Sequence, residues 1–211
     1  DVRGIVHQHG LDIAIHLATP QGEAEVELQV PGRHNARNAV AAAAACLAAG
    51  LPLAAVVAGL AAFAGVKGRL QRRAGRNGAV VLDDTYNANP DSVRAGIDVL
   101  ASTIGRKILV LGDMGEIGEA SAQYHDEVGG YAKSQGIDRL LTLGDIAPIA
   151  ARNFGEGGLA CRSPEELLAA LSPELTPAAT VLVKGSRFMK MERIADAIAA
   201  APAAEKPKEG A

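Results

Sequence analysis

Residues 79–90 read Ala79-Val-Val-Leu-Asp-Asp-Thr-Tyr-Asn-Ala-Asn-Pro90, an apolar run that passes directly into a polar segment. The run predicts a short buried strand, and Pro90 suits the first position of a helix that Asn89 caps. The same alternation continues along the chain, with further strands expected at residues 107–112, 139–143 and 180–184. Short apolar strands that alternate with amphipathic helices predict an α/β fold, here a Rossmann-like parallel sheet with helices on both faces. We expect this domain to span residues 67–201.

The helices of this domain are predicted from apolar residues that recur on one face. The first is striped by Val93, Ile97, Leu100 and Ile104, and the last by Phe188, Met191, Ile194 and Ile198. Between them, helices are expected at residues 121–135, shortly after Asp145, and at residues 165–171. The polar, proline-containing segment 202–211 is predicted to be a disordered tail.

The first 66 residues follow a different pattern. Residues 1–30 alternate apolar and polar positions, which predicts a hairpin with its turn at residues 20–22. Helices are expected at residues 35–49 and 53–63, and the glycine-containing segment 65–69 is the expected hinge. A hairpin and two helices bury little apolar surface, and the chain begins without Met. We therefore expect residues 1–66 to be the closing part of a truncated domain.

Composition and charge narrow the class of protein. The net charge is −3, from 21 Lys and Arg against 24 Asp and Glu, which argues against nucleic acid or a membrane surface as a partner. The longest apolar run, residues 39–51, is too short for membrane insertion. No leader pattern is visible, and the two cysteines lack metal-type spacing, so we expect a cytoplasmic protein.

Polar side chains gather where three predicted strands end, at residues 83–90, 112–116 and 184–187. Ligands of parallel sheets bind beyond the carboxyl ends of the strands, so these segments define the candidate site. Asp84 can accept both hydroxyls of a ribose, although a strand-end Asp that starts a turn is the commoner case. Lys184 and Ser186 suit an anion, or equally a plain turn with Ser186 as a helix cap.

Two further features precede this domain. Asn35 and Asn38 lie three residues apart near a helix start, so both carboxamides can face the donor–acceptor edge of a purine. Capping of the helix by Asn35 is the simpler alternative. Arg69 at the hinge can bridge a phosphate or ribose between domains, or be a solvated surface arginine.

The sequence lacks the motifs of several other kinds of binding or catalytic site. It contains no Gly-x-x-x-x-Gly-Lys-Ser/Thr phosphate loop, and the glycines of residues 112–118 do not follow the dinucleotide-binding pattern. His7 and His9 have no third ligand at a metal-type spacing, so we expect solvated strand histidines and no metal site. His125 has no evident partner for a catalytic triad.

Five elements in this order resemble the Mur ligase family. They are Pro31-Gly-Arg-His-Asn-Ala-Arg-Asn38, Gly68-Arg69, Asp83-Asp-Thr-Tyr-Asn-Ala-Asn-Pro-Asp-Ser92, Val110-Leu-Gly-Asp-Met-Gly-Glu116 and Val183-Lys-Gly-Ser-Arg187. The resemblance implies three domains, and residues 1–66 would end the central ATPase-like domain while residues 67–201 form the C-terminal one. The phosphate loop and the Mg²⁺ ligands of the family would precede Asp1, so we expect this piece to be inactive alone.

The resemblance further implies an ATP-dependent ligase of peptidoglycan precursor synthesis, which would join D-alanyl-D-alanine to UDP-N-acetylmuramoyl-tripeptide (UDP-MurNAc-tripeptide) through an acyl phosphate. The implied cofactors are ATP and Mg²⁺. The nucleotide-binding residues would be His34, Asn35, Asn38, Arg69 and Asp84. The acceptor side would be lined by Tyr86, Asn87, Lys184 and Ser186, with Lys184 the candidate for a catalytic role.

Two alternatives stay open beside this reading. One is another amino-acid ligase of the same family. The other is a non-catalytic nucleotide- or ligand-binding module, which predicts a start codon near Asp1 and a self-sufficient first domain.

Overall fold

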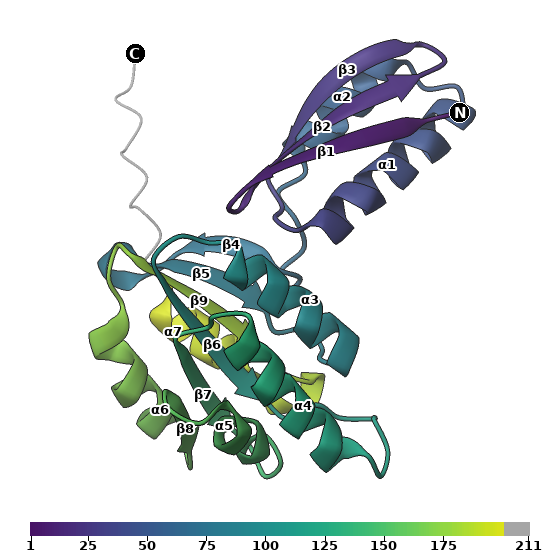
Figure 1. Cartoon of the computed structure of the whole chain (residues 1–211). Helices are drawn as coiled ribbons and strands as arrows, with labels where there is room; N and C mark the ends of the chain where they lie inside the picture. Colours follow the sequence, from purple (N-terminus) through teal and green to yellow (C-terminus); the bar gives the residue numbers. More distant parts are fainter. Residues whose placement is uncertain (201–211) are drawn as a thin grey trace, which may run out of the picture.

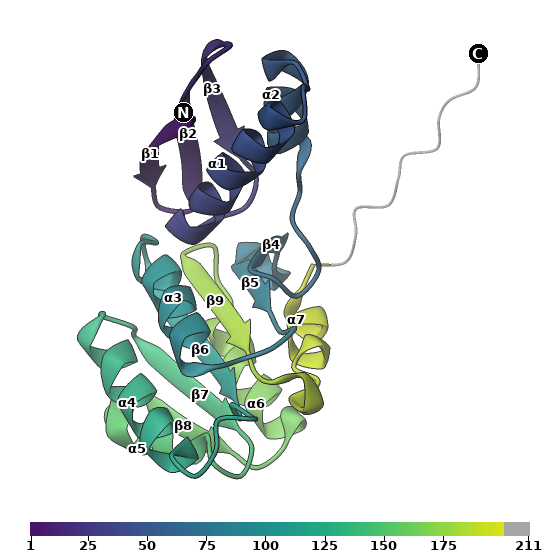
Figure 2. The same ribbon diagram turned by 90° about the vertical axis from the view of Figure 1, so that its right-hand side faces the viewer.

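The computed structural model describes residues 1–200, which form two units joined by the segment 63–70 (Figure 1). The N-terminal unit contains a three-stranded sheet and two helices, and the C-terminal unit contains a six-stranded sheet covered by helices. The view turned by 90° shows the same division (Figure 2). The predicted tail, residues 202–211, lies outside the described residues.

The N-terminal sheet is antiparallel, in the order β1-β2-β3. Its strands are β1 (Arg3–His9), β2 (Asp12–Thr19) and β3 (Gly22–Leu28). In β2, every second residue, namely Ile13, Ile15 and Leu17, is buried, because successive side chains of a strand point to opposite faces. The expected hairpin corresponds to β2 and β3, and β1 adds an edge strand.

Two helices cover one face of this sheet, α1 (Arg33–Ala48) and α2 (Leu53–Ala62). In α1, Ala36, Ala39 and Ala43 are buried at spacings of three and four, so small side chains form the face that packs inward. Within residues 1–200, no helix is both long enough and apolar enough to cross a membrane.

The C-terminal sheet follows the order β4-β5-β9-β6-β7-β8. Five neighbouring strands are parallel: β5 (Val80–Asp84), β9 (Ala179–Lys184), β6 (Arg106–Gly112), β7 (Arg139–Leu143) and β8 (Gly158–Cys161). The edge strand β4 (Gln71–Ala74) runs antiparallel to β5. The predicted α/β fold with a Rossmann-like parallel sheet is confirmed, and the structure adds β4 and β8 to the four expected strands.

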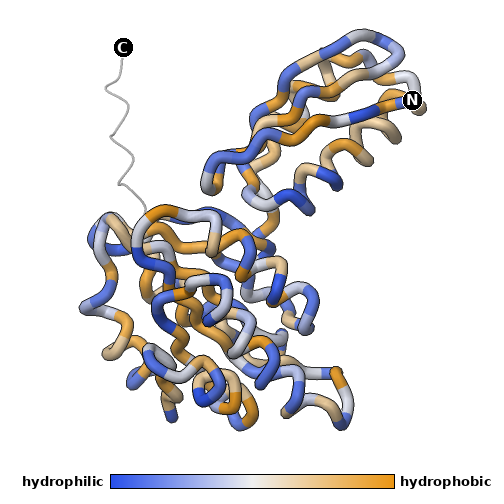
Figure 3. Tube along the Cα trace, in the orientation of Figure 1, coloured by the Kyte–Doolittle hydropathy of each residue, from blue (hydrophilic) through white to orange (hydrophobic). Residues whose placement is uncertain are grey.

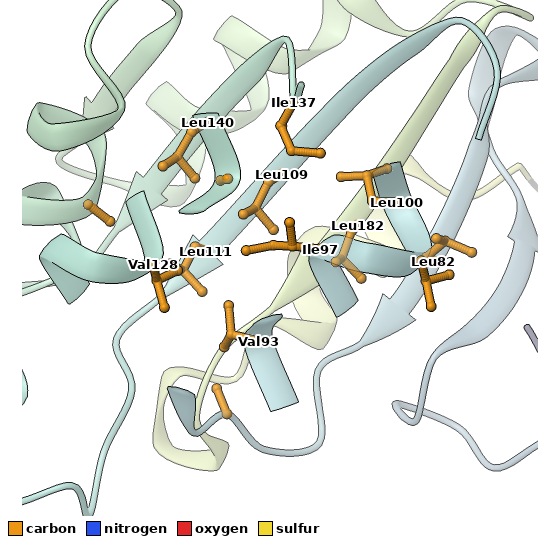
Figure 4. Close-up of a cluster of buried hydrophobic side chains, with 14 of the residues drawn as sticks. Leu82, Val93, Ile97, Leu100, Leu109, Leu111, Val128, Ile137, Leu140 and Leu182 are labelled. Carbon is orange, nitrogen blue, oxygen red and sulfur yellow. The ribbon is translucent and has the colours of Figure 1, made fainter. Parts of the chain in front are cut away.

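Helices cover both faces of this sheet (Figures 1 and 2). One face carries α3 (Pro90–Ala101), α4 (Ser121–Ser134) and α5 (Pro148–Phe154), and the other carries α6 (Pro164–Leu171) and α7 (Glu192–Ile198). The hydropathy colouring shows hydrophobic residues concentrated along the inner strands (Figure 3). In the core beneath α3, Ile97 and Leu100 lie beside Leu109 and Leu182 (Figure 4).

Two predicted helices differ from the structure at one end. Ile104 lies beyond the end of α3 and is 84% exposed, because the chain turns at Gly105, where φ is +87°, to enter β6. Phe188 lies in a separate 3₁₀ turn and is 63% exposed. The left-handed Lys190, with φ of 50°, separates that turn from α7.

The register of the sheet determines where the candidate site lies. Asp84 at the end of β5 is opposite Lys184 at the end of β9, and Lys184 is opposite Leu111 near the end of β6. The polar segments that follow these three strands therefore meet at one edge of the sheet, as the sequence predicts.

Candidate functional site

A cavity of about 430 Å³ lies where the start of α1 faces the carboxyl ends of β5 and β9. Its walls come from segments far apart in the sequence, and eight of the nine predicted site residues line it, Ser186 being the exception. The lining residues are His34, Asn35, Asn38, Gly68, Arg69, Leu70, Asp84, Tyr86, Asn87, Ala88, Asn89, Ser92, Ala95, Gly96 and Lys184.

Two carboxamides project from the first turns of α1. The N-cap of this helix is Gly32, so the prediction that an asparagine opens it is wrong. Asn35 lies inside the first turn and donates from its amide nitrogen to the carbonyl oxygen of Pro31 at 2.7 Å. Asn38, three residues on, is exposed to the cavity and can offer a ligand both a donor and an acceptor.

His34, one residue before Asn35 in α1, also lines the cavity. The residue is exposed as a whole, yet one edge of its ring packs on Gly32, where a Cβ would lie only 2.7 Å from Cε1. Partial burial, which disfavours the charged ring, lowers the pKa of His34 below its ordinary value, with Asp84 opposing this shift and Lys184 adding to it. Burial therefore favours the neutral form of the His34 imidazole in the cavity.

The connecting segment is fixed to the loop after β5. The amide of Tyr86 donates to the carbonyl oxygen of Gly68 at 2.9 Å, and the amide of Leu70 donates to Oδ1 of Asp84 at 3.0 Å. The guanidinium of Arg69 lies over the Tyr86 ring, 4.2 Å from its centre. Gly68 has φ of +75°, and a Cβ there would lie 3.1 Å from the Tyr86 nitrogen, so this approach requires glycine.

Asp84 and Lys184 form an ion pair across the ends of β5 and β9. Nζ of Lys184 lies 2.6 Å from Oδ2 of Asp84 and also donates to the carbonyl oxygen of Asn87 at 2.9 Å. The Lys184 side chain is 3% exposed, whereas that of Asp84 is 17% exposed. A ligand in the cavity can therefore reach Asp84, while two of the three N–H donors of the Lys184 ammonium are taken by protein groups. The predicted contact of Lys184 with an acceptor stays a prediction.

The polar loop after β5 ends in a capped helix. The side chain of Asn89 accepts from the amide of Ser92 at 2.8 Å, and Ser92 Oγ accepts from the amide of Asn89 at 3.0 Å, with Pro90 in the first turn. The expected capping role of Asn89 is confirmed. Tyr86 and Asn87, on the same loop, are exposed and line the cavity.

Ser186 joins three loops and does not line the cavity. Its hydroxyl accepts from the amide of Gly115 at 2.6 Å and donates to the carbonyl oxygen of Ala88 at 3.1 Å, and its own amide donates to the carbonyl oxygen of Asp113 at 2.9 Å. The side chain makes no helix-cap hydrogen bond. Ser186 is 3% exposed, so its predicted contact with a ligand also stays a prediction.

Helix α3 supplies one wall of the cavity through Ser92, Ala95 and Gly96, which are not among the predicted site residues. A Cβ at Gly96 would lie 3.0 Å from Cδ2 of Leu182 and 3.8 Å from both Oδ2 of Asp84 and Cδ of Lys184. The helix therefore packs closely over the ion pair. The signal in the sequence is the spacing of small residues at i, i+3 and i+4, which places them on one helix face.

Possible metal ligands among the described residues are His, Cys, Asp and Glu side chains. Within residues 1–200, no three His, Cys, Asp or Glu side chains converge as metal ligands, and His7 and His9 are no exception.

An apolar groove of about 400 Å³ adjoins the cavity and shares Asn35, Asn38 and Arg69 with it. Its other lining residues are mostly apolar: Leu28, Val30, Ala39, Ala42, Gly59, Leu60, Phe63, Gly65 and Val66. An apolar slot with carboxamides at its mouth suits a flat heteroaromatic ring, whose faces are apolar and whose edge carries donors and acceptors. With Asp84 across the cavity, the arrangement suits such a ring joined to a diol.

Comparison with known proteins gives a family match and named relatives. Residues 68–187 match the family described as Mur ligase, glutamate ligase domain. The UDP-N-acetylmuramoyl-tripeptide–D-alanyl-D-alanine ligase of Escherichia coli K12 is 40% identical over 198 residues, which cover 92% of this chain and 42% of the relative. The ligase of the same name from Mycobacterium tuberculosis H37Rv is 35% identical over 210 residues, covering 87% of this chain and 41% of the relative. The chain thus spans about 42% of the length of these curated relatives.

Solved structures give the same kind of match. A crystal structure of MurF from Acinetobacter baumannii superposes with a TM-score of 0.85 at 35% identity, covering 93% of this chain and 45% of that one. MurF from Thermotoga maritima in complex with ADP gives a TM-score of 0.77 at 23% identity, covering 92% and 44%, which is a likeness of fold alone.

Proposed function

The chain belongs to the Mur ligase family, and on that premise we propose that its cleft binds an adenine nucleotide for an ATP-dependent ligase. In the whole protein, residues 1–66 would end the central ATP-binding domain, and residues from 67 onward would form the C-terminal domain. The observation that carries this proposal is that Asn38, Arg69 and Asp84, from three separate segments, line one cavity.

The chemistry of the lining residues supports one orientation of the nucleotide. The base enters the apolar groove, where Asn35 and Asn38 face its edge and His34 closes the side. The ribose hydroxyls donate to the Asp84 carboxylate. Arg69, held over Tyr86 at the mouth of the cavity, reaches the ribose or the first phosphate.

The reaction that we propose for the whole protein adds D-alanyl-D-alanine to UDP-MurNAc-tripeptide. The terminal carboxylate of the tripeptide attacks the γ-phosphorus of ATP, which forms an acyl phosphate and releases ADP. The amine of D-alanyl-D-alanine then attacks the acyl carbon, and the tetrahedral intermediate expels phosphate and leaves an amide bond. This route replaces a poor leaving group by phosphate, and positioning supplies much of the remaining acceleration. Tyr86 and Asn87 would face the acceptor.

The 211 residues contain no Gly-Lys-Ser/Thr sequence and therefore no phosphate loop of that type. Such a loop cradles the phosphates through its backbone amides and lysine, and Mg²⁺, when bound, neutralises charge on the transferring phosphoryl group. We propose that this chain alone binds nucleotide but does not transfer phosphate.

Isothermal titration calorimetry of ADP and GDP into the 211-residue chain tests the nucleotide site. We expect ADP to bind more tightly than GDP, because the carboxamides match an adenine edge. Asn38→Ala should weaken ADP binding by up to about tenfold and reduce the preference for ADP, since one hydrogen bond contributes about 0.5–1.5 kcal/mol. Asp84→Asn should weaken the binding of ADP and GDP by the same factor, because both carry a ribose.

The controls are Gln135→Ala and Asp145→Asn, which change exposed groups away from the cavity. Thermal denaturation of each variant establishes that it is folded before titration. Equal nucleotide affinity in the site variants and these controls would show that the nucleotide does not bind in this cavity.

A second test addresses turnover. The chain is mixed with ATP, UDP-MurNAc-tripeptide, D-alanyl-D-alanine and Mg²⁺, and phosphate release is compared with that of the full-length E. coli relative. We expect release by the relative and none above buffer by this chain. Release by the chain would overturn the proposal that its own residues lack a phosphate-transfer site.

A further inference from the structure

We propose that Lys184 is a positioning residue that holds the Asp84 carboxylate in place for a ribose diol and, through Asp84, holds the connecting segment at Leu70. The proposal rests on the proposed nucleotide site. It gives Lys184 a role different from direct contact with an acceptor or with the reacting atoms.

The burial of Lys184 supports this role. Its side chain is 3% exposed and ends at the wall of the cavity, with α3 packed over it at Gly96. Two of its three N–H donors are occupied, by Oδ2 of Asp84 at 2.6 Å and the carbonyl oxygen of Asn87 at 2.9 Å. Protein groups therefore take up most of the hydrogen-bonding capacity of this ammonium.

The carboxylate of Asp84, in contrast, is held in place and can still accept further hydrogen bonds. Oδ1 accepts from the amide of Leu70 at 3.0 Å, and Oδ2 accepts from Lys184. Each carboxylate oxygen has two lone-pair sites, so each retains one for a hydroxyl. Two fixed oxygens with one free site each match the two adjacent hydroxyls of a ribose. Without Lys184, the carboxylate would be free to turn away from this orientation.

The same contacts hold the end of the connecting segment against the C-terminal unit. Leu70 belongs to the connecting segment, is 3% exposed, and has φ of 52°, a left-handed conformation that costs a non-glycine residue about 1 kcal/mol or more. The hydrogen bond from its backbone amide to the Asp84 carboxylate is one contact that holds this conformation. Loss of Lys184 should therefore loosen Leu70 as well as the ribose site.

The test compares ADP with 2′,3′-dideoxy-ADP in the unaltered chain, Lys184→Met and Lys107→Met. Lys107 is the matched control, since it is a strand lysine near the opposite end of the same sheet. We expect the unaltered chain and Lys107→Met to prefer ADP by about tenfold or more, because hydrogen bonds to a charged group contribute about 1.5–3 kcal/mol. In Lys184→Met the preference should fall to about twofold, while affinity for the dideoxy compound changes little.

If Lys184→Met only lowered the stability of the chain, both nucleotides would bind more weakly by the same factor, and the preference for ADP would remain. That result would overturn the positioning role. Lys184→Gln, which removes the charge but keeps a donor, should also lose most of the preference and replaces the Met variant if that one fails to fold. In an Asp84→Asn background, Lys184→Met should have no further effect on the preference. If Lys184→Met reduced the preference for ADP in that background as much as it does alone, the proposal would be overturned too.

A second measurement needs no nucleotide and separates this proposal from the proposed function. Hydrogen exchange at the Leu70 amide should be about tenfold faster in Lys184→Met, while amides inside β6 and β7 exchange at unchanged rates. If the exchange rate of the Leu70 amide were unchanged in Lys184→Met, the proposal that Lys184 positions Asp84 would be overturned. If the unaltered chain binds neither nucleotide, the nucleotide site fails and the ribose role falls with it, whereas faster exchange at Leu70 would still support the hold on the connecting segment.

Discussion

Buried polar side chains hold the loops at the carboxyl edge of the sheet. Asp113 accepts hydrogen bonds from the backbone amides of residues 145–147 at 2.7–3.0 Å. His125 accepts from the amide of Met114 at Nε2 and donates from Nδ1 to the carbonyl oxygen of Ser121. Polar groups buried in this way cost little only while their partners are in place. The position of the loop after β6 therefore depends on these two side chains.

His34 provides a prediction at the scale of one residue. Partial burial lowers its pKa below the ordinary value of 6.5, and Asp84 opposes that shift. Because the pKa is lower in the folded chain than in the unfolded chain, the contribution of His34 to stability is complete above about pH 6.5 and is lost as the pH falls through the folded pKa. Asp84→Asn should lower the pKa of His34 further. NMR titration of the imidazole between about pH 5 and 8 measures both values.

A rise of the His34 pKa in Asp84→Asn would contradict the proximity of these two groups. Asp145→Asn, a change of an exposed carboxylate outside the cavity, serves as the control and should leave the His34 titration unchanged.

The sequence predicts which residues gather at the site better than what each one does. Asn38, Arg69 and Asp84 meet at one cavity because strand ends and helix starts follow from local patterns. The pairing of Lys184 with Asp84 joins residues 100 positions apart and leaves no local signal. Such partners become visible only once the order of the strands is known.

At the scale of elements, α4 and α5 pack closely through a glycine. A Cβ at Gly129 would lie 2.2 Å from the carbonyl oxygen of Ala150, a backbone atom that cannot move without shifting α5. A Cβ at the adjacent Gly130 would meet the end of the Asn153 side chain at 3.1 Å, and that side chain can adjust. The two neighbouring glycines therefore have different roles.

Alanine substitution should separate these two roles. Gly129→Ala should destabilise the chain by about 1–3 kcal/mol through overpacking. Gly130→Ala should lie between no change and a gain of about 1 kcal/mol, because alanine favours a helix over glycine. Urea denaturation followed by circular dichroism measures both. If both substitutions lowered the free energy of unfolding by similar amounts, contact with α5 would not be the reason for glycine at position 129.

Strand prediction from the sequence succeeds where apolar runs are continuous and fails at the edges of the sheet. Residues 181–183 and 108–111 are buried apolar runs, and their strands follow from that pattern. The edge strand β4 contains Arg72 and Arg73, and its place depends on pairing with β5 and on ion pairs of Arg73 with Asp83 and Asp196. Partners of this kind come from other parts of the chain, so the segment alone does not predict a strand.

At the scale of the whole molecule, the N-terminal unit has one apolar core and the C-terminal unit has two, one on each face of its sheet. Besides the connecting segment, the turn between β1 and β2 contacts the end of α3. Gln8 donates to Ser102 Oγ at 3.3 Å, and Ser102 Oγ donates to the carbonyl oxygen of Gly10 at 3.0 Å. Arg72 and Asp12 add an exposed ion pair at 3.0 Å. Leu11, in the same turn, packs against the C-terminal core. These contacts are few, and an exposed ion pair contributes at most about 1 kcal/mol, so the two units should unfold separately.

The tyrosines allow this separation to be observed. Tyr86, Tyr124 and Tyr131 are the three tyrosines of the chain, all in the C-terminal unit, and the sequence has no Trp. Tyrosine fluorescence therefore reports on one unit, whereas far-ultraviolet circular dichroism reports on both. The N-terminal unit has the smaller core, so it should unfold at lower urea concentration. We expect circular dichroism to show two transitions and tyrosine fluorescence to follow the second.

Core variants assign the two transitions to the two units. Ile15→Ala should lower the midpoint of the first transition only, and Leu109→Ala that of the second only, because each removes a fully buried side chain from one core at a cost of about 2–5 kcal/mol. Tyr86→Phe removes the tyrosine nearest the connecting segment, so a fluorescence change caused only by separation of the units would disappear in that variant. If all probes coincide and both core variants shift one common midpoint, the units unfold together, and the few contacts between them are stronger than we expect.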